Sequence, residues 1–284
     1  MAISIAHLGP SGTNAETAAV QYSTWLTQTS GQDTVLCPCP SITRTLQVVA
    51  QGQVDIAVVP VENSIEGSVT TTLDTLWQLD QLQIQGQLVL PIFHALIAHT
   101  ESLTDIQTVY SHPQALAQCQ VWLETSLPKA QLIAVNSTAE AVQRLAQEPA
   151  AAAVASERAA QLYNVPVLTS PINDHPDNCT RFWVLSLQPS PGGPYTSLAF
   201  SVHDLPGALV KPLQVFADRA INLTRIESRP TKRSLGDYLF FIDLEADAHS
   251  PAVQDALENL RQHYTDTLKV FGSYNVLPTS PLAE

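Results

Sequence analysis

The sequence predicts an α/β protein in two parts. The larger N-terminal part is expected to hold a largely parallel sheet, and the smaller C-terminal part a ferredoxin-like βαββαβ fold. Three observations predict this. Before residue 187, short apolar runs alternate with helical patterns. Residues 187–195 then contain three prolines and two adjacent glycines, which can continue neither a helix nor a strand. After them the order is strand, helix, strand, strand, helix, strand.

We expect the apolar runs of the N-terminal part to be strands, because they are short and lie between turn residues. They span residues 3–8, 54–60, 88–98, 108–110, 131–135, 151–155 and 182–187. Three hydroxyl residues precede a Glu or Gln by three positions, which is the spacing of a capping box at a helix N-terminus. The pairs are Thr13 with Glu16, Ser111 with Gln114, and Ser137 with Glu140.

In the C-terminal part, Leu198, Phe200 and Val202 alternate with polar neighbours and indicate the first strand. The remaining elements are expected as a helix over 206–219, strands over 222–226 and 238–246, a helix over 251–263 and a strand over 268–276.

Four segments follow strand-like runs with hydroxyl or amide residues and are expected to open helices: residues 9–13, 62–64, 111–114 and 136–138. A helix N-terminus has unpaired N–H groups and a partial positive charge, so several of them together would bind a small anion. Ligands of such sheets bind beyond the carboxyl ends of the strands. The sequence therefore predicts an anion-binding, catalytic cleft with a regulatory domain behind it. A fifth segment, residues 178–182, adds a hydroxyl beside a guanidinium.

Composition and charge exclude several functions. The formal net charge of −13 leaves no basic surface for nucleic acid. No apolar run reaches spanning length, and the first residues lack the order of a secretory signal, so we expect a cytoplasmic protein without a membrane partner. The four cysteines do not have zinc-site spacing, and neither a metal nor a cofactor is expected.

The same segments carry a family resemblance. They are residues 8–13 (LGPSGT), 59–69 (VPVENSIEGSV), 111–119 (SHPQALAQC), 137–141 (STAEA), 155–160 (ASERAA) and 178–182 (NCTRF). In this number and order they resemble the prephenate dehydratase family, and the C-terminal part resembles the ACT domain that accompanies this enzyme. The resemblance implies a catalytic domain over residues 1–187, with two lobes like a periplasmic binding protein and prephenate between them. It also implies an ACT regulatory domain over residues 196–280, which pairs with a copy in another subunit of a homodimer or homotetramer.

The chemistry that the resemblance implies needs no metal. Loss of carbon dioxide from prephenate pushes electrons through the ring and expels the ring hydroxyl, so the site has to orient two carboxylates and assist the departing hydroxyl. Thr180 is the expected hydrogen-bond donor to that hydroxyl, and an ordinary strand threonine is the alternative. Arg181 is expected to bind a substrate carboxylate, or else to hold Glu62 or Glu66 in place.

The resemblance also implies a set of substrate-binding residues: Gly12, Thr13, Glu62, Asn63, Ser64, Ser111, His112, Gln114, Ser137, Thr138 and Phe182. Helix capping is the structural alternative for several of them, and Phe182 is more typical of a core than of a wall that stacks on the substrate ring. His112 is either a proton donor or a solvated residue at a helix start.

Phenylalanine or another aromatic amino acid is the expected effector, at Gly207, Ala208, Leu209, Val210, Glu227, Ser228, Arg229 and Pro230. Three positions depart from the family pattern. Asn14 stands where an aromatic residue is usual, Pro212 falls within the expected helix, and Ala220 replaces a glycine. Two other functions stay open at this point: an arogenate dehydratase, and a non-catalytic receptor for small anions or amino acids.

Overall fold

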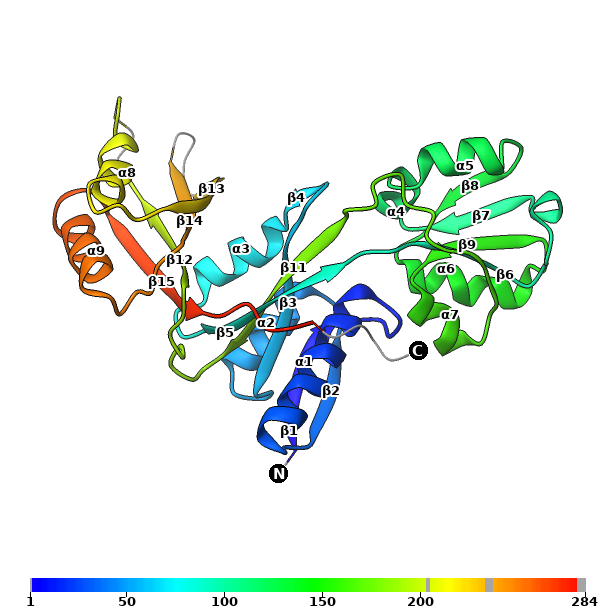
Figure 1. The fold of residues 1–284 in the computed structure, drawn as a ribbon, viewed down its shortest axis with the longest axis horizontal. Helices are drawn as coiled ribbons and strands as arrows, with labels where there is room; N and C mark the ends of the chain where they lie inside the picture. The colour runs from blue at the N-terminus through cyan, green and yellow to red at the C-terminus, as the bar shows by residue number, and fades with distance from the viewer. Residues whose placement is uncertain (1, 203–204, 233–236, 280–284) are drawn as a thin grey trace.

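The structure is a computed structural model that describes residues 2–202, 205–232 and 237–279. Figure 1 shows an elongated molecule of three bodies. Lobe 1 lies in the middle, lobe 2 at one end and the C-terminal domain at the other. The N-terminal part is thus divided into two lobes, as the family resemblance implies.

Lobe 1 is a mixed sheet in the order β2-β1-β3-β11-β5, with β4 beside β3. Its elements are β1 (Ile3–Leu8), α1 (Asn14–Ser30), β2 (Thr34–Cys39), α2 (Ile42–Ala50), β3 (Ile56–Asn63), β4 (Gly67–Ser68), α3 (Thr70–Gln78), β5 (Gln83–Pro91) and β11 (Cys179–Ser186). β1 is parallel to β2 and β3, whereas β11 is antiparallel to both β3 and β5. The expectation of a largely parallel sheet is therefore wrong for the β11 side of lobe 1.

Lobe 2 is a second sheet in the order β10-β6-β9-β7-β8. Its elements are β6 (Ala95–Ala98), η1 (Leu103–Asp105), β7 (Thr108–Ser111), α4 (Pro113–Ala117), α5 (Gln120–Ser126), β8 (Gln131–Ala134), α6 (Thr138–Arg144), η2 (Leu145–Gln147), β9 (Ala151–Ala155), α7 (Glu157–Tyr163) and β10 (Val167–Thr169). β7 is parallel to β8 and β9, and β6 is antiparallel to β9 and β10.

The chain crosses between the lobes twice. The run expected as one strand over 88–98 is in fact β5 and β6, and residues 92–94 between them carry the chain from lobe 1 into lobe 2. Residues 170–178 carry it back to β11. A prediction based on hydrophobicity misses this break because β5 and β6 are both buried, each in its own lobe.

The C-terminal domain has the expected βαββαβ order. It consists of β12 (Tyr195–Ser201), α8 (Val210–Ala217), β13 (Leu223–Pro230), β14 (Tyr238–Leu244), α9 (Pro251–His263) and β15 (Thr267–Tyr274), with an antiparallel sheet in the order β13-β14-β12-β15. One face of this sheet packs on α8 and α9 through residues such as Phe200 and Ile242. The other face, with Phe241 and Phe271, shares a buried cluster with Trp183 of lobe 1. The domain is therefore docked on lobe 1 through an apolar core.

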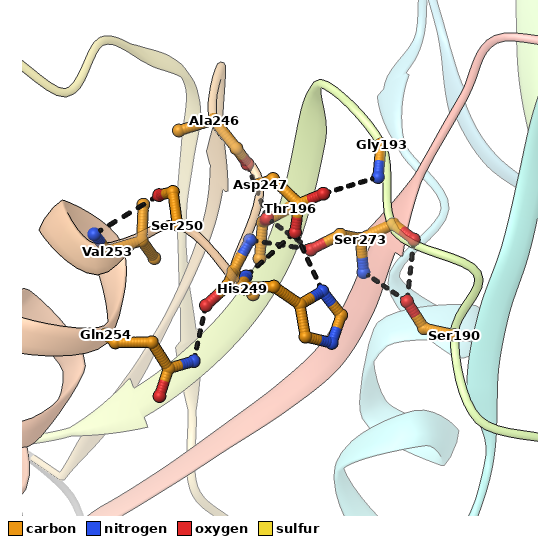
Figure 2. A network of polar contacts seen from close by, with 11 residues as sticks. Ser190, Gly193, Thr196, Ala246, Asp247, His249, Ser250, Val253, Gln254 and Ser273 are labelled. Carbon is orange, nitrogen blue, oxygen red and sulfur yellow. Dashed lines mark hydrogen bonds and ion pairs between the residues drawn. The ribbon is translucent and has the colours of Figure 1, made fainter.

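The segment expected as a linker is fastened by a polar network, which Figure 2 shows. Ser190 Oγ donates to the Ser273 carbonyl at 2.6 Å and accepts from the Ser273 amide at 2.7 Å. The Gly193 amide donates to Asp247 Oδ2 at 2.9 Å. Thr196 Oγ1 and Ser273 Oγ lie 2.8 Å apart. The linker is thus a structured part of the C-terminal domain.

Two departures from the family pattern gain a structural account. Helix α8 starts only at Val210, so Pro212 lies in its first turn, where the backbone N–H has no partner within a helix and proline costs little. Ala220 has φ +52°, the left-handed region that glycine adopts without strain. Its side chain is exposed in the single chain.

Candidate active site

A cleft of about 710 Å³ lies between the lobes. Lobe 1 contributes residues that follow β1, end β3 and begin β11, and lobe 2 contributes residues around the starts of α4 and α6. Eight of the residues expected from the sequence line it: Thr13, Asn63, His112, Gln114, Ser137, Thr138, Thr180 and Phe182. Asn14, one of the three positions that depart from the family pattern, also lines the cleft.

Two of the predicted capping boxes are confirmed, and both lie at the cleft. Thr13 Oγ1 accepts from the Glu16 amide at 3.3 Å, and Ser137 Oγ accepts from the Glu140 amide at 3.0 Å. Each Glu side chain reaches back, but to the amide one residue before the cap: Glu16 accepts from the Gly12 amide at 2.7 Å and Glu140 from the Asn136 amide at 3.2 Å. The caps hold the starts of α1 and α6 at the cleft from opposite lobes.

The capping box predicted at Ser111 is wrong. Ser111 is the last residue of β7, and its buried hydroxyl donates to the Val154 carbonyl at 2.5 Å. His112 caps α4 instead, because its Nδ1 accepts from the Gln114 amide at 3.3 Å. In the neutral ring the proton therefore lies on Nε2. Residues 62–64 also do not open a helix, since Asn63 ends β3 and α3 begins only at Thr70.

Two lining residues of the cleft, Asn63 and Thr180, lie opposite each other on β3 and β11 and are joined by a hydrogen bond. Asn63 Nδ2 donates to Thr180 Oγ1 at 2.9 Å and to Asn178 Oδ1 at 2.8 Å. Asn63 Oδ1 accepts from the amides of Ile65 and Glu66 at 3.0 and 3.1 Å, which fixes the orientation of its amide group. Because Thr180 Oγ1 is the acceptor, its own hydrogen is available to a molecule in the cleft.

Two cleft residues, His94 and Gln118, escape the sequence analysis. Gln118 Oε1 accepts from His94 Nε2 at 2.9 Å and from Asn178 Nδ2 at 2.9 Å, so both residues belong to the network that reaches Thr180. Burial lowers the pKa of His94 more than the hydrogen bond to Gln118 raises it, so the imidazole is neutral near pH 7. The spacing of Gln118 one helical turn after Gln114 is the signal that could have found it.

The prediction that Arg181 binds a substrate carboxylate is not supported, because Arg181 does not line the cleft. Its Nη2 lies 2.7 Å from Asp243 Oδ2 of the C-terminal domain and 3.1 Å from Glu62 Oε2. The second alternative, that Arg181 holds Glu62, agrees with this pair. Successive side chains of a strand point to opposite faces, so Thr180 and Arg181 cannot both face the cleft. The described residues that line the cleft include neither a lysine nor an arginine.

Four expected substrate-binding residues, Gly12, Glu62, Ser64 and Ser111, also lie outside the cleft lining. Ser64 Oγ accepts from the Cys179 amide at 3.0 Å, so it fastens the start of β11. Gly12 has φ +89°, and a Cβ there would lie 3.4 Å from Ala159 of lobe 2. Ser64 and Gly12 therefore contact neighbouring segments of the chain and do not line the cleft.

The start of α1 is tied across to lobe 2. Glu16 Oε2 accepts from Arg158 Nε of α7 at 3.0 Å, and Ser156 Oγ donates to the Gly12 carbonyl at 3.0 Å. Burial raises the pKa of Glu16, but hydrogen bonds from Arg158 and Gly12 together lower it further, so the carboxylate is charged at neutral pH. We call Glu16 and Arg158 the interlobe pair.

The expected effector residues lie in two places. Residues 207–210 precede or begin α8. On β13 the side chains alternate, so that Ser228 and Pro230 are exposed while Glu227 and Arg229 face lobe 1. Glu227 Oε2 accepts from Ser68 Oγ at 3.0 Å, and Arg229 Nη2 lies 2.9 Å from Asp74 Oδ2 of α3. Residue 280, the expected end of the domain, lies outside the described residues.

The fold and the cleft define a two-lobed α/β protein whose interlobe cleft is lined by helix starts, amides and hydroxyls, and which is joined to a ferredoxin-like domain. In the described ranges, no helix is long and apolar enough to span a membrane, and no three His, Cys, Asp or Glu residues are placed to hold a metal ion.

Comparisons with known proteins identify the family. The prephenate dehydratase family model matches residues 5–190, and the ACT domain model matches residues 196–262. The chain is 43% identical over 275 residues to a bifunctional chorismate mutase/prephenate dehydratase of Aquifex aeolicus, covering 96% of this chain and 73% of that protein. It is 38% identical over 279 residues to a prephenate dehydratase of Mycobacterium sp. (strain JLS), covering 95% and 88%.

The crystal structure of prephenate dehydratase from Arthrobacter aurescens in complex with L-Phe superposes with a TM-score of 0.85 at 35% identity, covering 99% of this chain and 92% of that one. This chain belongs to the prephenate dehydratase family. It is an enzyme that converts prephenate to phenylpyruvate, water and carbon dioxide in phenylalanine biosynthesis. The alternative of a non-catalytic receptor is thereby set aside.

Proposed function

We propose that the interlobe cleft is the active site and that Thr180 donates a hydrogen bond to the departing hydroxyl of prephenate. The Asn63–Thr180 hydrogen bond carries this proposal, because it occupies one lone pair of Thr180 and leaves the hydroxyl hydrogen to point into the cleft. The bond from the ring carbon to the carboxylate breaks, its electrons form the aromatic ring, and the C–O bond breaks. The leaving oxygen takes one proton. Thr180 is too weak an acid to be its source, so it passes on a proton that comes from the medium.

The substrate carboxylates are held without a guanidinium. The start of α1 at Thr13 offers backbone N–H groups from lobe 1, and Gln114, Ser137 and Thr138 offer donors from lobe 2. Neutral donors in the cleft orient the ring carboxylate. The cleft also shields this carboxylate from water, which favours its loss as carbon dioxide.

The test is a pair of variants. Thr180→Val keeps the shape and removes the hydroxyl, and turnover should fall by about 10²-fold or more, whereas Thr180→Ser should keep most of it. The phenylpyruvate absorbance measures both rates, and thermal unfolding shows whether the fold survives. A folded Thr180→Val variant with turnover within about threefold of the parent would rule out this role for Thr180.

For the substrate, prephenate is favoured over arogenate. Arogenate has an ammonium group where prephenate has a ketone, and Glu140 is the carboxylate among the described residues that line the cleft. Glu140 already accepts from Arg144 and Asn136. Faster turnover of arogenate than of prephenate by the purified protein would reverse this preference.

The regulatory domain is proposed to bind phenylalanine or another aromatic amino acid at residues 207–210 and 227–230, in a homodimer or homotetramer in the cytoplasm. The L-Phe complex of the Arthrobacter enzyme supports this effector. Rates measured with and without phenylalanine, together with the mass in solution, test the effector and the assembly. A rate that phenylalanine leaves unchanged contradicts the effector proposal.

A further inference from the structure

Three neighbouring strands of lobe 1 place a polar side chain toward the C-terminal domain. Ser68 of β4 is paired with Glu62 of β3, and Glu62 with Arg181 of β11. We call these three residues the polar row. In the next register position Asn63 lies opposite Thr180. The side chains of a strand alternate between its faces, so the polar row lies directly behind the Asn63–Thr180 pair.

The C-terminal domain holds the polar row through buried charges. Arg181 Nη2 contacts Asp243 Oδ2 of β14 at 2.7 Å, and the exposed fractions of the two side chains are 17% and 2%. Arg225 Nη2 of β13 donates to Ser68 Oγ at 2.8 Å, and Ser68 Oγ donates to Glu227 Oε2 at 3.0 Å. A charge buried to this degree fixes the geometry of its partners, because separating them leaves a desolvated charge unpaired.

A second arrangement of these charges is close at hand. Arg225 Nη1 lies 3.8 Å from Asp243 Oδ2 and Arg225 Nε lies 3.9 Å from Glu62 Oε2, both just beyond hydrogen-bond distance. Neither of these nitrogens donates to a protein acceptor within the described ranges. A small rotation of the C-terminal domain would bring Arg225 onto Glu62, one of the two carboxylates that now hold Arg181.

We propose that Arg181 is a positioning residue: its contact with Asp243 keeps β11 and β3 in the register that aims Thr180 into the cleft. Full turnover then requires the C-terminal domain to be docked as it is here. A ligand on β13, which carries Arg225 and Glu227, reaches the active site by shifting the polar row. This inference rests on the proposed role of Thr180. It is a shift of geometry and includes no covalent step.

The experiment compares steady-state kinetics and thermal unfolding of the full-length protein and its variants. Arg181→Met removes the charge and keeps the length of the side chain, and Asp243→Asn removes the partner in the other domain. Asp74→Asn is the matched control, because Asp74 also forms an ion pair with β13, through Arg229, but lies on α3 away from the cleft strands. Glu62→Gln tests the polar row at a side chain that is 37% exposed, where the fold tolerates the change.

We expect Arg181→Met and Asp243→Asn each to lower kcat about tenfold with KM within about threefold, since misplacing a catalytic group by about an ångström costs up to 10²-fold. The double variant should be no slower than either single variant, because the two residues act as one unit. Arg181→Lys should recover most of kcat, because one nitrogen of Arg181 serves both carboxylates. Asp74→Asn should keep kcat within about twofold.

Other outcomes overturn the inference. A raised KM with unchanged kcat in Arg181→Met, without recovery by Arg181→Lys, would show that Arg181 binds the substrate with its two-nitrogen fork. Equal losses in Asp74→Asn would show that domain docking in general matters and the polar row does not. If Asp243→Asn does not fold, the Glu62→Gln variant is the test. A kcat of Glu62→Gln equal to that of the parent would then refute the inference. Failure of the active-site proposal is distinguishable, because it would appear in Thr180→Val.

Discussion

The interlobe pair provides a prediction with a magnitude and a pH dependence. Arg158→Met leaves Glu16, whose side chain is 9% exposed, without its charged partner. Breaking a fully buried pair costs about 3–5 kcal/mol. Because Arg158 itself is 29% exposed, solvent screens the pair, and we expect a loss of about 2 kcal/mol at neutral pH. For a chain of 284 residues that corresponds to a fall in Tm of about 3 °C, because the entropy of unfolding grows with chain length.

The pH dependence follows from the sign of the pKa shift. In the parent protein the pKa of folded Glu16 is lowered, so its stabilisation is present above the unfolded pKa and is lost as pH falls through the folded pKa. In Arg158→Met the lowering effect of Arg158 on the pKa of folded Glu16 is lost, so the carboxylate stabilises the fold less at neutral pH than it does in the parent. The difference in Tm between the two proteins should therefore shrink from about pH 7.5 to about pH 3.5.

Calorimetry at several pH values checks this prediction. Arg144→Met is the control, since it removes an exposed pair with Glu140 of the same lobe, and it should leave Tm nearly unchanged at every pH. A difference between parent and Arg158→Met that is as large at about pH 3.5 as at neutral pH would refute the reasoning.

Three further variants test other positions. Gly193→Ala should unfold the linker network and lower Tm sharply, because a Cβ there would lie 2.4 Å from the backbone of Tyr274; an unchanged Tm would contradict the geometry. Ala220→Gly should raise stability by up to about 1 kcal/mol in denaturant titrations, since φ +52° strains alanine, and a loss of stability would contradict the strain. Ser111→Ala should cost about 1–2 kcal/mol, because it removes a buried hydrogen bond to the Val154 carbonyl, yet should not change KM, because Ser111 does not line the cleft.

Local signals in the sequence predict much of the fold. The bounds of β1, β9 and α9 agree with the expected ones, because each element is a compact pattern bounded by caps or turn residues. The caps at Thr13 and Ser137 are predicted correctly for the same reason. Strand β2 is missed because Pro38 interrupts its pattern, and the structure tolerates this proline because β2 is an edge strand.

Long-range features are less accessible from the sequence. The break of the run over 88–98 depends on where the chain leaves lobe 1, and no local residue signals it. The docking of the C-terminal domain on lobe 1 cannot be predicted from the sequence either, since Phe241 and Phe271 have the same apolar character as the residues that face α8 and α9. His94 reaches the cleft only through the crossing between the lobes.

Arg181 shows how a motif can mislead when its residues are taken together. In the segment Thr180-Arg181-Phe182, strand alternation alone predicts that Thr180 and Phe182 share one face and that Arg181 has the other. The structure agrees, with Thr180 and Phe182 at the cleft and Arg181 between Glu62 and Asp243. A charged residue between two cleft residues of a strand therefore points to the opposite face of the sheet, where it contacts whatever packs there and does not reach the substrate. In this enzyme the ACT domain lies behind the sheet.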